Sequence, residues 1–231
     1  CTVAHLNPSQ IGSVCVGLAG AARPEISELI NRIVSELVPG KVEVVGDNVI
    51  ALQAAFGGGP GVIVIAGTGS IAYGRNREGQ TARAGGWGFA ISDEGSGHWI
   101  GRTAVAAAIG AWDEKPEQDL RLIEMLMKSW SLQTIEQVVP AANATPPPDF
   151  SALFPAVLSL ADSGDRIARD VLIQAGTQLA NLAGVLLLRL FPHAGAVPVA
   201  MSGGVFGSSA LVRQIFYNSL CSEHPNAMLN P

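Results

Sequence analysis

The chain has 231 residues, of which 48% are hydrophobic and 14% are charged, and its formal net charge is −5 at pH 7. An acidic balance without a basic cluster argues against a nucleic-acid-binding surface, and the longest apolar run, around residues 179–191, is too short for a membrane span. The cysteines Cys1, Cys15 and Cys221 form no CxxC pair, so neither a metal site within one chain nor a disulfide framework is expected.

The first sixty residues alternate between strand and helix patterns. Residues 11–20 and 41–45 predict strands. Residues 23–38 predict a helix, because apolar residues recur at helical spacing: Ile26, Leu29, Ile30, Ile33 and Leu37. Asp47 is expected to cap a helix over 48–56, and a third strand covers 62–67. This order predicts a mostly parallel α/β sheet, buried on both faces.

The glycine-rich run Gly57–Gly61 is the expected hinge and domain boundary. It divides the chain into an N-terminal domain, 1–58, and a C-terminal domain, 59–231. The second part opens on strands linked by tight turns, with "NREG" at 76–79 as one of them.

Helical patterns dominate the rest of the second part. Residues 103–112, 116–138 and 208–220 predict helices, and 151–191 is largely helical, with Pro155 as a kink or a first-turn proline. Residues 140–149 predict a loop because of their consecutive prolines. Residues 196–204 predict a buried strand that ends in a turn of small residues.

Two glycine turns are candidates for binding an anion. "GTGS" at 67–70 follows one strand and precedes another, so its backbone N–H groups and the Thr68 hydroxyl could bind phosphate, or it could be a plain hairpin turn. "SGG" at 202–204 lies between a strand and a helix. It predicts either a close backbone approach to a ligand or only a tight turn.

The stretch "GGWGFAISDEGSGHWIG" at 85–101 is the least regular part of the chain. It contains two of the four tryptophans, and we expect a poor strand and a poor helix there. Asp93 and Glu94 are adjacent, so on an extended chain only one of them would face a ligand. Trp87 could contact a ligand or cover a core. Packing is the expected role of Trp99, and a surface or packing role is expected for His98.

Together these pieces resemble the N-acetylglucosamine kinase group of the BadF/BadG/BcrA/BcrD ATPase family, in the sugar-kinase/Hsp70/actin superfamily. The residues that carry the resemblance are "VGLAGAARPE" at 16–25, Asp47 after "VEVV", "IAGTGS" at 65–70, the stretch at 85–101 and "SGGV" at 202–205. The resemblance implies two ribonuclease H-like, actin-like ATPase domains around an interdomain cleft, with a sugar-binding loop and a helical insert in the second domain.

The resemblance also implies a role for each motif. Asp47 is the implied catalytic base. The ATP-binding residues are Gly67, Thr68, Gly69 and Ser70 of the phosphate turn and Ser202, Gly203 and Gly204 of the adenosine-side turn. The sugar contacts are Gly86, Trp87, Gly88, Asp93 and Glu94. The implied reaction transfers the γ-phosphate of ATP, with Mg²⁺, to the 6-hydroxyl of N-acetylglucosamine, in a cytoplasmic protein that could form a homodimer.

The sequence also departs from the family pattern. No DxGGT-type phosphate loop occurs before residue 11, so we expect that about sixty family residues, and with them some Mg²⁺ ligands, precede this chain. The family's last strand and helix are likewise expected to be missing. Ser92 stands where relatives usually have glycine.

Several functions remain open alternatives. Glucosamine, N-acetylmannosamine or a muramic acid derivative could replace N-acetylglucosamine as the substrate. An activating ATPase of a 2-hydroxyacyl-CoA dehydratase would hold an iron–sulfur cluster with cysteines from two subunits, but Cys15 is expected inside a buried strand. A non-catalytic sugar sensor is the third alternative.

Overall fold

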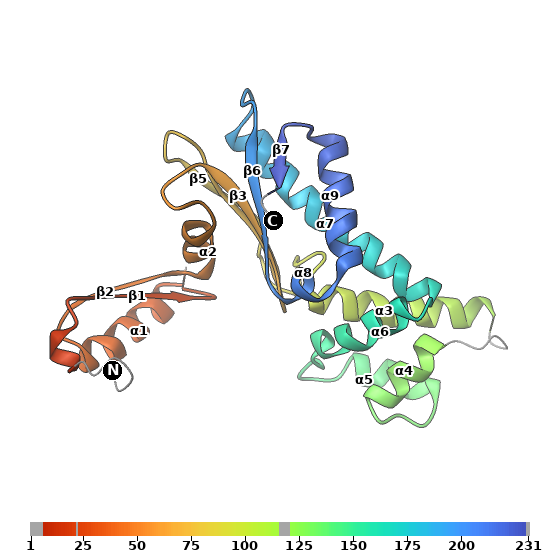
Figure 1. Cartoon of the computed structure of the whole chain (residues 1–231). Coiled ribbons are helices and arrows are strands. Elements are labelled where there is room, and N and C mark those ends of the chain that lie inside the picture. Colours follow the sequence, from red (N-terminus) through yellow and green to blue (C-terminus); the bar gives the residue numbers. More distant parts are fainter. Residues whose placement is uncertain (1–6, 22, 116–120, 230–231) are drawn as a thin grey trace. The chain divides into compact units, whose positions relative to one another are not determined.

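The computed structural model describes residues 7–21, 23–115 and 121–229, so Cys1 and the expected helical residues 116–120 lie outside the described residues. The chain divides into two units, Cys1–Gly59 and Pro60–Pro231, which we call unit 1 and unit 2 and describe separately (Figure 1). Their identity with the two expected domains, and the hinge between them, stay predictions.

Unit 1 is built on a pair of parallel strands. β1 (Ser13–Leu18) and β2 (Lys41–Gly46) pair in register from Ser13↔Lys41 to Leu18↔Gly46. Parallel strands need a crossover connection, and α1 (Pro24–Leu37) supplies it. A short 3₁₀ helix, Pro8–Gln10, precedes β1, and α2 (Asp47–Phe56) follows β2. The predicted strand–helix–strand–helix order is therefore present. The third predicted strand, over 62–67, belongs to the sheet of unit 2, where one of its neighbours is antiparallel, so the expected mostly parallel sheet is not formed.

Unit 1 has little buried surface, which contradicts the expectation of strands buried on both faces. Its buried hydrophobic residues are Ala21, Val38 and Leu52 among the described residues. The strand β1 alternates exposed and half-buried residues, and Cys15, expected inside, is exposed. Cys15 and Gly17 share one face of β1, and the Ile50 side chain of α2 lies against that face at Gly17.

The sheet of unit 2 is mixed, with the order β5-β4-β3-β6-β7. The strands β3 (Gly61–Ala66), β4 (Ser70–Arg75) and β5 (Thr81–Gly85) form an antiparallel meander, whose second turn lies at the predicted "NREG". β6 (Val197–Ser202) pairs parallel to β3, and β7 (Ala227–Leu229) pairs parallel to β6. The strand β7 was not predicted from the sequence, because three residues are too few to show a period.

Seven α-helices of unit 2 lie within the described residues (Figure 1). Their bounds are α3 Gly97–Glu114, α4 Arg121–Ser129, α5 Val138–Ala142, α6 Phe154–Asp162, α7 Arg166–Leu190, α8 Gly204–Ser208 and α9 Ala210–Glu223, with 3₁₀ turns at Ile135–Gln137 and Phe150–Leu153, the longer turn leading into α6. In Figure 1, α7 and α9 run side by side.

Two helix predictions need correction. The expected helix over 121–138 is broken, because α4 ends at Ser129 and Ser131 has a left-handed φ of 56°. The expected loop at 140–149 begins as a helix, since Pro140 lies in the first turn of α5, where no backbone N–H is needed. Pro155 takes the second of its two predicted roles, as a first-turn proline of α6.

The helix α7 forms the centre of the unit 2 core. By length and composition alone this 25-residue helix could cross a membrane. The sequence had suggested only a shorter apolar run, too short for a membrane span. Much of α7 is buried inside unit 2, including Leu172, Leu179 and Leu186. Its small residues allow close packing: a Cβ on Gly176 would lie 2.8 Å from Cβ of Ile215 in α9. This is the pattern of a core helix.

Candidate functional site

The two glycine turns predicted to bind nucleotide lie next to each other in unit 2. β3 and β6 are parallel neighbours, with Ile65 opposite Ser202, so the turns that follow them leave the same edge of the sheet. In α/β proteins ligands bind outside the carboxyl ends of parallel strands. The turn at Gly67–Gly69 also closes the β3–β4 hairpin, so the plain-hairpin interpretation is confirmed and a phosphate role is compatible with it.

Gly203 is required by its surroundings. Its φ is 99°, and a Cβ there would lie 2.3 Å from the carbonyl oxygen of Ala66. Any larger residue would push the second turn away from the end of β3. The backbone of Gly203 is thus held against the start of the Gly67–Gly69 turn.

The segment 93–98 is hydrogen-bonded to the phosphate turn. The N–H groups of Gly97 and His98, at the start of α3, donate to the carbonyl oxygens of Gly67 (2.8 Å) and Thr68 (3.2 Å). α3 begins at Gly97 because Ser96 caps it, its hydroxyl accepting from the N–H of Trp99 at 3.1 Å. The helix therefore starts inside the stretch expected to be a poor helix, and the sequence-based start at residue 103 was wrong.

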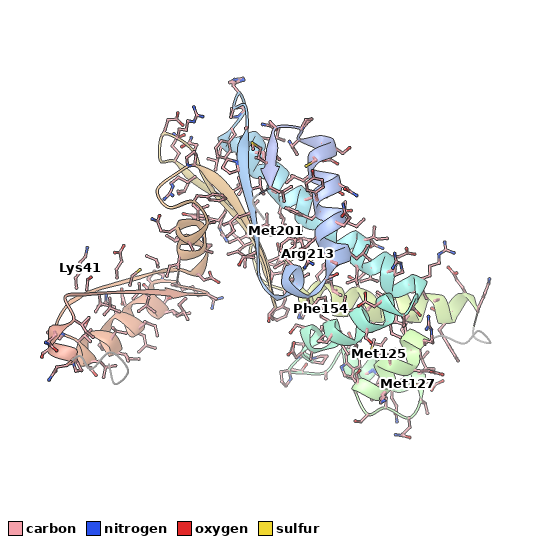
Figure 2. All side chains as sticks on the ribbon, viewed as in Figure 1. Lys41, Met125, Met127, Phe154, Met201 and Arg213 are labelled. Atoms are coloured by element: carbon pink, nitrogen blue, oxygen red, sulfur yellow. The ribbon has the colours of Figure 1, made fainter. Side chains whose placement is uncertain are left out.

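A hollow of about 440 Å³ lies beside both turns. Its lining combines residues of the turns and of α3, α6 and α8: Gly67, Thr68, Gly97, Ser151, Phe154, Pro155, Leu158, Gly204, Val205 and Ser208. Phe154 projects from the start of α6 toward α8, and Arg213 holds α8 by donating to the carbonyl oxygens of Phe206 and Gly207 (Figure 2). An apolar wall beside backbone donors suits a flat ring that carries an anionic group.

Asp93 is a buried carboxylate, 8% exposed, with a left-handed φ of 69°. The backbone N–H groups of Ser70 and Gly88 donate to its side chain. Burial raises the pKa of Asp93, while those two hydrogen bonds act in the opposite direction. A carboxylate has about four acceptor positions, so Asp93 can hold the loop and still accept from a ligand hydroxyl.

Ser70 and Glu94 connect the same two segments. The Ser70 hydroxyl, predicted to face phosphate, is buried and donates to the carbonyl oxygen of Glu94 at 2.8 Å. The Glu94 carboxylate accepts from the Ser92 hydroxyl at 3.1 Å. Both side chains therefore stabilise the loop.

Trp87 does not cover the core, because 64% of it is exposed. The Arg83 guanidinium lies over its ring, 3.9 Å from the centroid. Phe89 and Ile91 of the same loop are also exposed, which leaves an apolar surface beside Asp93. Trp99, by contrast, packs against the core as expected.

His98 lies in a row of aromatic rings. Its ring centroid is 4.8 Å from that of Phe89 and 5.2 Å from that of Phe150, and Phe150 in turn contacts Trp130. Burial, together with Arg102, lowers the pKa of His98, whereas Asp93 and Asp149 act in the opposite direction. A surface or packing role was expected for His98, and these contacts show packing.

Asp47 lies in unit 1, as the first residue of α2. It is not the expected N-cap: Gly46 occupies that position, and the Asp47 carboxylate accepts from the N–H of Asn48 at 2.9 Å. Glycine can take the cap position because the extended conformation needs no side chain there. Asp47 is exposed, so its carboxylate can reach a ligand.

A Mg²⁺ ion binds phosphate oxygens, water and one or two carboxylates. Within 7–21, 23–115 and 121–229, no three His, Cys, Asp or Glu side chains gather in a way that could hold a metal ion. The described residues therefore do not fit a metal site made by the protein alone.

Sequence reasoning missed the far wall of the hollow. Ser151, Phe154, Pro155 and Leu158 lie some eighty residues beyond the phosphate turn and belong to a stretch whose only visible signal was helical. Arg83 had a signal that could have been used, because it stands two residues before "GGWG".

Comparison with known proteins adds a family and several relatives. A sequence model of the BadF/BadG/BcrA/BcrD ATPase family matches residues 1–228. An N-acetylmuramic acid/N-acetylglucosamine kinase of Clostridium acetobutylicum is 32% identical over 223 residues, which cover 95% of this chain and 72% of that protein. An N-acetyl-D-glucosamine kinase of Dictyostelium discoideum is 28% identical over 224 residues, covering 94% and 70%.

The fold also has a solved counterpart. A crystal structure from Chromobacterium violaceum, whose assignment as an N-acetylglucosamine kinase is itself provisional, matches with a TM-score of 0.69 at 27% identity. The match covers 93% of this chain and 70% of that one. The chain thus spans about seven-tenths of the length of these relatives.

Proposed function

This chain belongs to the BadF/BadG/BcrA/BcrD ATPase family, and from that premise we propose that it is an ATP-dependent kinase of amino sugars. The reaction moves the γ-phosphoryl group of ATP to a sugar hydroxyl. The proposed product is a hexosamine 6-phosphate, with N-acetylglucosamine as the substrate. Sugar kinases among its relatives, two of them named for N-acetylglucosamine, support this choice.

One observation carries the proposal: the phosphate turn and the proposed sugar loop are joined by hydrogen bonds. The N–H groups of Gly97 and His98 donate to the carbonyl oxygens of Gly67 and Thr68. The backbone N–H of Ser70 donates to the Asp93 carboxylate. A phosphate bound at the turn and a hydroxyl bound at Asp93 would therefore keep a fixed separation. Phosphoryl transfer depends mostly on such positioning.

Each residue has a proposed role. Gly67, Thr68 and Gly69 bind phosphate, and Ser202, Gly203 and Gly204 border the adenosine, whose base occupies the hollow against Phe154 and Leu158. Gly86, Trp87, Gly88, Asp93 and Glu94 form the sugar loop, with Asp93 accepting from hydroxyl groups. Charge-assisted hydrogen bonds of this kind are the strong ones.

Asp47 is the proposed general base. The attacking hydroxyl oxygen forms a bond to the γ-phosphorus, the bond from that phosphorus to the β–γ bridging oxygen breaks, and the hydroxyl proton passes to the Asp47 carboxylate. ADP leaves with the bridging oxygen. Mg²⁺ is proposed to arrive with the nucleotide, where its charge offsets that of the phosphates.

The identity of the amino sugar is decided by a substrate panel. The protein is assayed with ATP–Mg²⁺ and a coupled readout of ADP against N-acetylglucosamine, glucosamine, N-acetylmannosamine and N-acetylmuramic acid. We expect N-acetylglucosamine to give the highest kcat/KM. No sugar-dependent ADP release with any of the four would overturn the proposal, and binding without turnover would support a sugar sensor instead.

The remaining expectations are part of the same proposal. We propose a cytoplasmic protein that acts on small molecules, without a nucleic-acid or membrane partner, and a homodimer as its assembly. Size-exclusion chromatography with light scattering measures the assembly directly.

A further inference from the structure

Arg83 makes two contacts with the sugar loop that the predicted roles do not use. Its guanidinium lies 3.9 Å from the centroid of the Trp87 ring, and its Nη1 donates to the carbonyl oxygen of Gly86 at 3.1 Å. The guanidinium is planar and carries several fixed donors, so one group can stack on a ring and bind an oxygen at the same time.

The backbone geometry explains why these residues meet. Gly85, Gly86 and Gly88 have positive φ values of 71°, 69° and 93°. This run of left-handed residues turns the chain back at the end of β5, so that Trp87 returns over the strand that carries Arg83. A side chain at Gly86 would collide with Ile71, since its Cβ would lie 2.8 Å from Cδ1 of that residue.

Trp87 is thereby held between two anchors. On one side Arg83 holds the carbonyl of Gly86. On the other side the Asp93 carboxylate accepts from the N–H of Gly88. The ring between them remains 64% exposed. A Trp this exposed buries little apolar surface of its own, so its orientation depends on these contacts.

The charge of Arg83 is not used in an ion pair. Among the described residues no carboxylate lies within 4 Å of it; the ion pairs there are Arg121–Asp165 and Arg166–Asp170. A second guanidinium, that of Arg189, donates to the backbone oxygen of Arg83 at 3.5 Å and ties β5 to α7. The cation is thus free to act through the Trp87 ring.

We propose that Arg83 is a positioning residue for the amino sugar, which presets Trp87 and the Gly86 carbonyl in the orientation that the sugar meets. The inference rests on the proposed function for its substrate and on the contacts above for its geometry. Preorganisation of this kind improves binding because the loop need not be ordered when the ligand arrives.

The test compares Arg83→Ala and Arg83→Lys with the native protein and with a matched control, Arg166→Ala. Arg166 forms a solvent-exposed pair whose loss costs little. We expect Arg83→Ala to raise the KM for the amino sugar roughly tenfold, equivalent to ~1.4 kcal/mol, with kcat and the KM for ATP within twofold. Lysine keeps the charge but lacks the planar fork. The sugar KM of Arg83→Lys should therefore lie between those of the native protein and Arg83→Ala.

A second measurement does not depend on activity. Trp87 is the exposed member of the four tryptophans, and Trp87→Phe isolates its emission by difference. Acrylamide quenching of that emission should rise in Arg83→Ala and stay native in Arg166→Ala.

The two measurements separate the inference from the function on which it rests. Unchanged quenching in folded Arg83→Ala, or an unchanged sugar KM in an active enzyme, overturns the role of Arg83. A native protein that phosphorylates none of the sugars overturns the proposed function, and the quenching still decides whether Arg83 positions Trp87.

Discussion

Asp93 combines an unfavourable backbone conformation with a buried charge. Non-glycine residues seldom have positive φ, although aspartate and asparagine adopt it more readily than most. Here the strained position lets one carboxylate reach the N–H groups of both Ser70 and Gly88. Asp93 therefore connects the phosphate turn to the proposed sugar loop, and the proposed ligand contact would add to that structural role.

The substitution Asp93→Asn should separate the two roles. Asparagine tolerates the left-handed backbone but removes the charge, so we expect the KM for the amino sugar to rise roughly ten- to a hundredfold, as for loss of charged hydrogen bonds worth about 1.5–3 kcal/mol. The KM for ATP should stay nearly native. Asp93→Ala should add a loss of thermal stability, because both N–H groups lose their partner. An unchanged sugar KM in folded Asp93→Asn would remove Asp93 from the sugar site.

His98 should make the stability of the protein sensitive to acid. Its pKa in the folded chain lies below the ordinary value of 6.5, so as pH falls through that value the unfolded chain takes up the proton first. Its contribution to folding is therefore complete above about pH 6.5 and is lost below it. Arg102, Asp93 and Asp149 are the charged groups that act on His98.

The measurement is the melting temperature of unit 2 as a function of pH. His98→Phe keeps a ring between Phe89 and Phe150 and cannot be protonated, so the part of the loss that begins near pH 6.5 should be absent from that variant. The same decline in both proteins would mean that other groups cause it.

Asp47 offers a direct choice between chemistry and helix stability. As general base, Asp47→Asn should lower kcat by about 10²–10⁴ and leave sugar binding within a few-fold. As only a negative charge in the first turn of α2, it would contribute ~0.3–1 kcal/mol to stability and nothing to turnover. Steady-state kinetics on folded Asp47→Asn decide, with Asp170→Asn on the surface of α7 as the control.

At the scale of elements, the turn after β6 has a strict requirement for glycine at position 203. Gly203→Ala would place a Cβ 2.3 Å from the Ala66 oxygen in a left-handed conformation, which costs about 1–2 kcal/mol before any collision is counted. We expect a lower melting temperature and weaker nucleotide binding. Gly207→Ala, in α8 with open space around it, should be neutral or slightly stabilising. Equal melting temperatures for the two variants would contradict the close approach.

Periodic elements could be predicted from the sequence, and elements defined by tertiary contacts could not. β1, α1, β2 and the β3–β4–β5 meander followed from apolar spacing and turn residues. The true start of α3 depended on a Ser96 cap and on hydrogen bonds to Gly67 and Thr68, which have no local signature. β7 is a strand only because β6 lies beside it.

The candidate site follows the same division. Its glycine turns and acid pair stood out in the sequence because such residues are unusual in that arrangement. The apolar wall from Phe154 to Leu158 looked like any amphipathic helix, because nothing in a helical period shows which ligand it faces. The partners of Asp93 are backbone groups, which every sequence contains.

At the scale of the whole molecule, the two units differ in how much they bury. Unit 1 has three buried hydrophobic residues among those described, whereas the core of unit 2 is continuous from Val62 to Ala227. Local opening free energies follow burial. Amides of β1 and β2 should therefore exchange hydrogen faster than those of β3, β6 and α7. Equal protection, measured by mass spectrometry, would show that unit 1 is stabilised by more than its own core.

The parallel pairing of β3 with β6 also determines the order in which contacts form during translation. On the ribosome the meander of β3, β4 and β5 can close as soon as it emerges, because its contacts are local. Val62 must then wait for Val199, which is translated much later, and the edge of β3 stays uncovered meanwhile. Such an edge is a site of mispairing. The nascent chain should therefore be most prone to misfolding while it is shorter than about 200 residues. The Gly203 turn, which completes the wall of the hollow, is made just beyond that length.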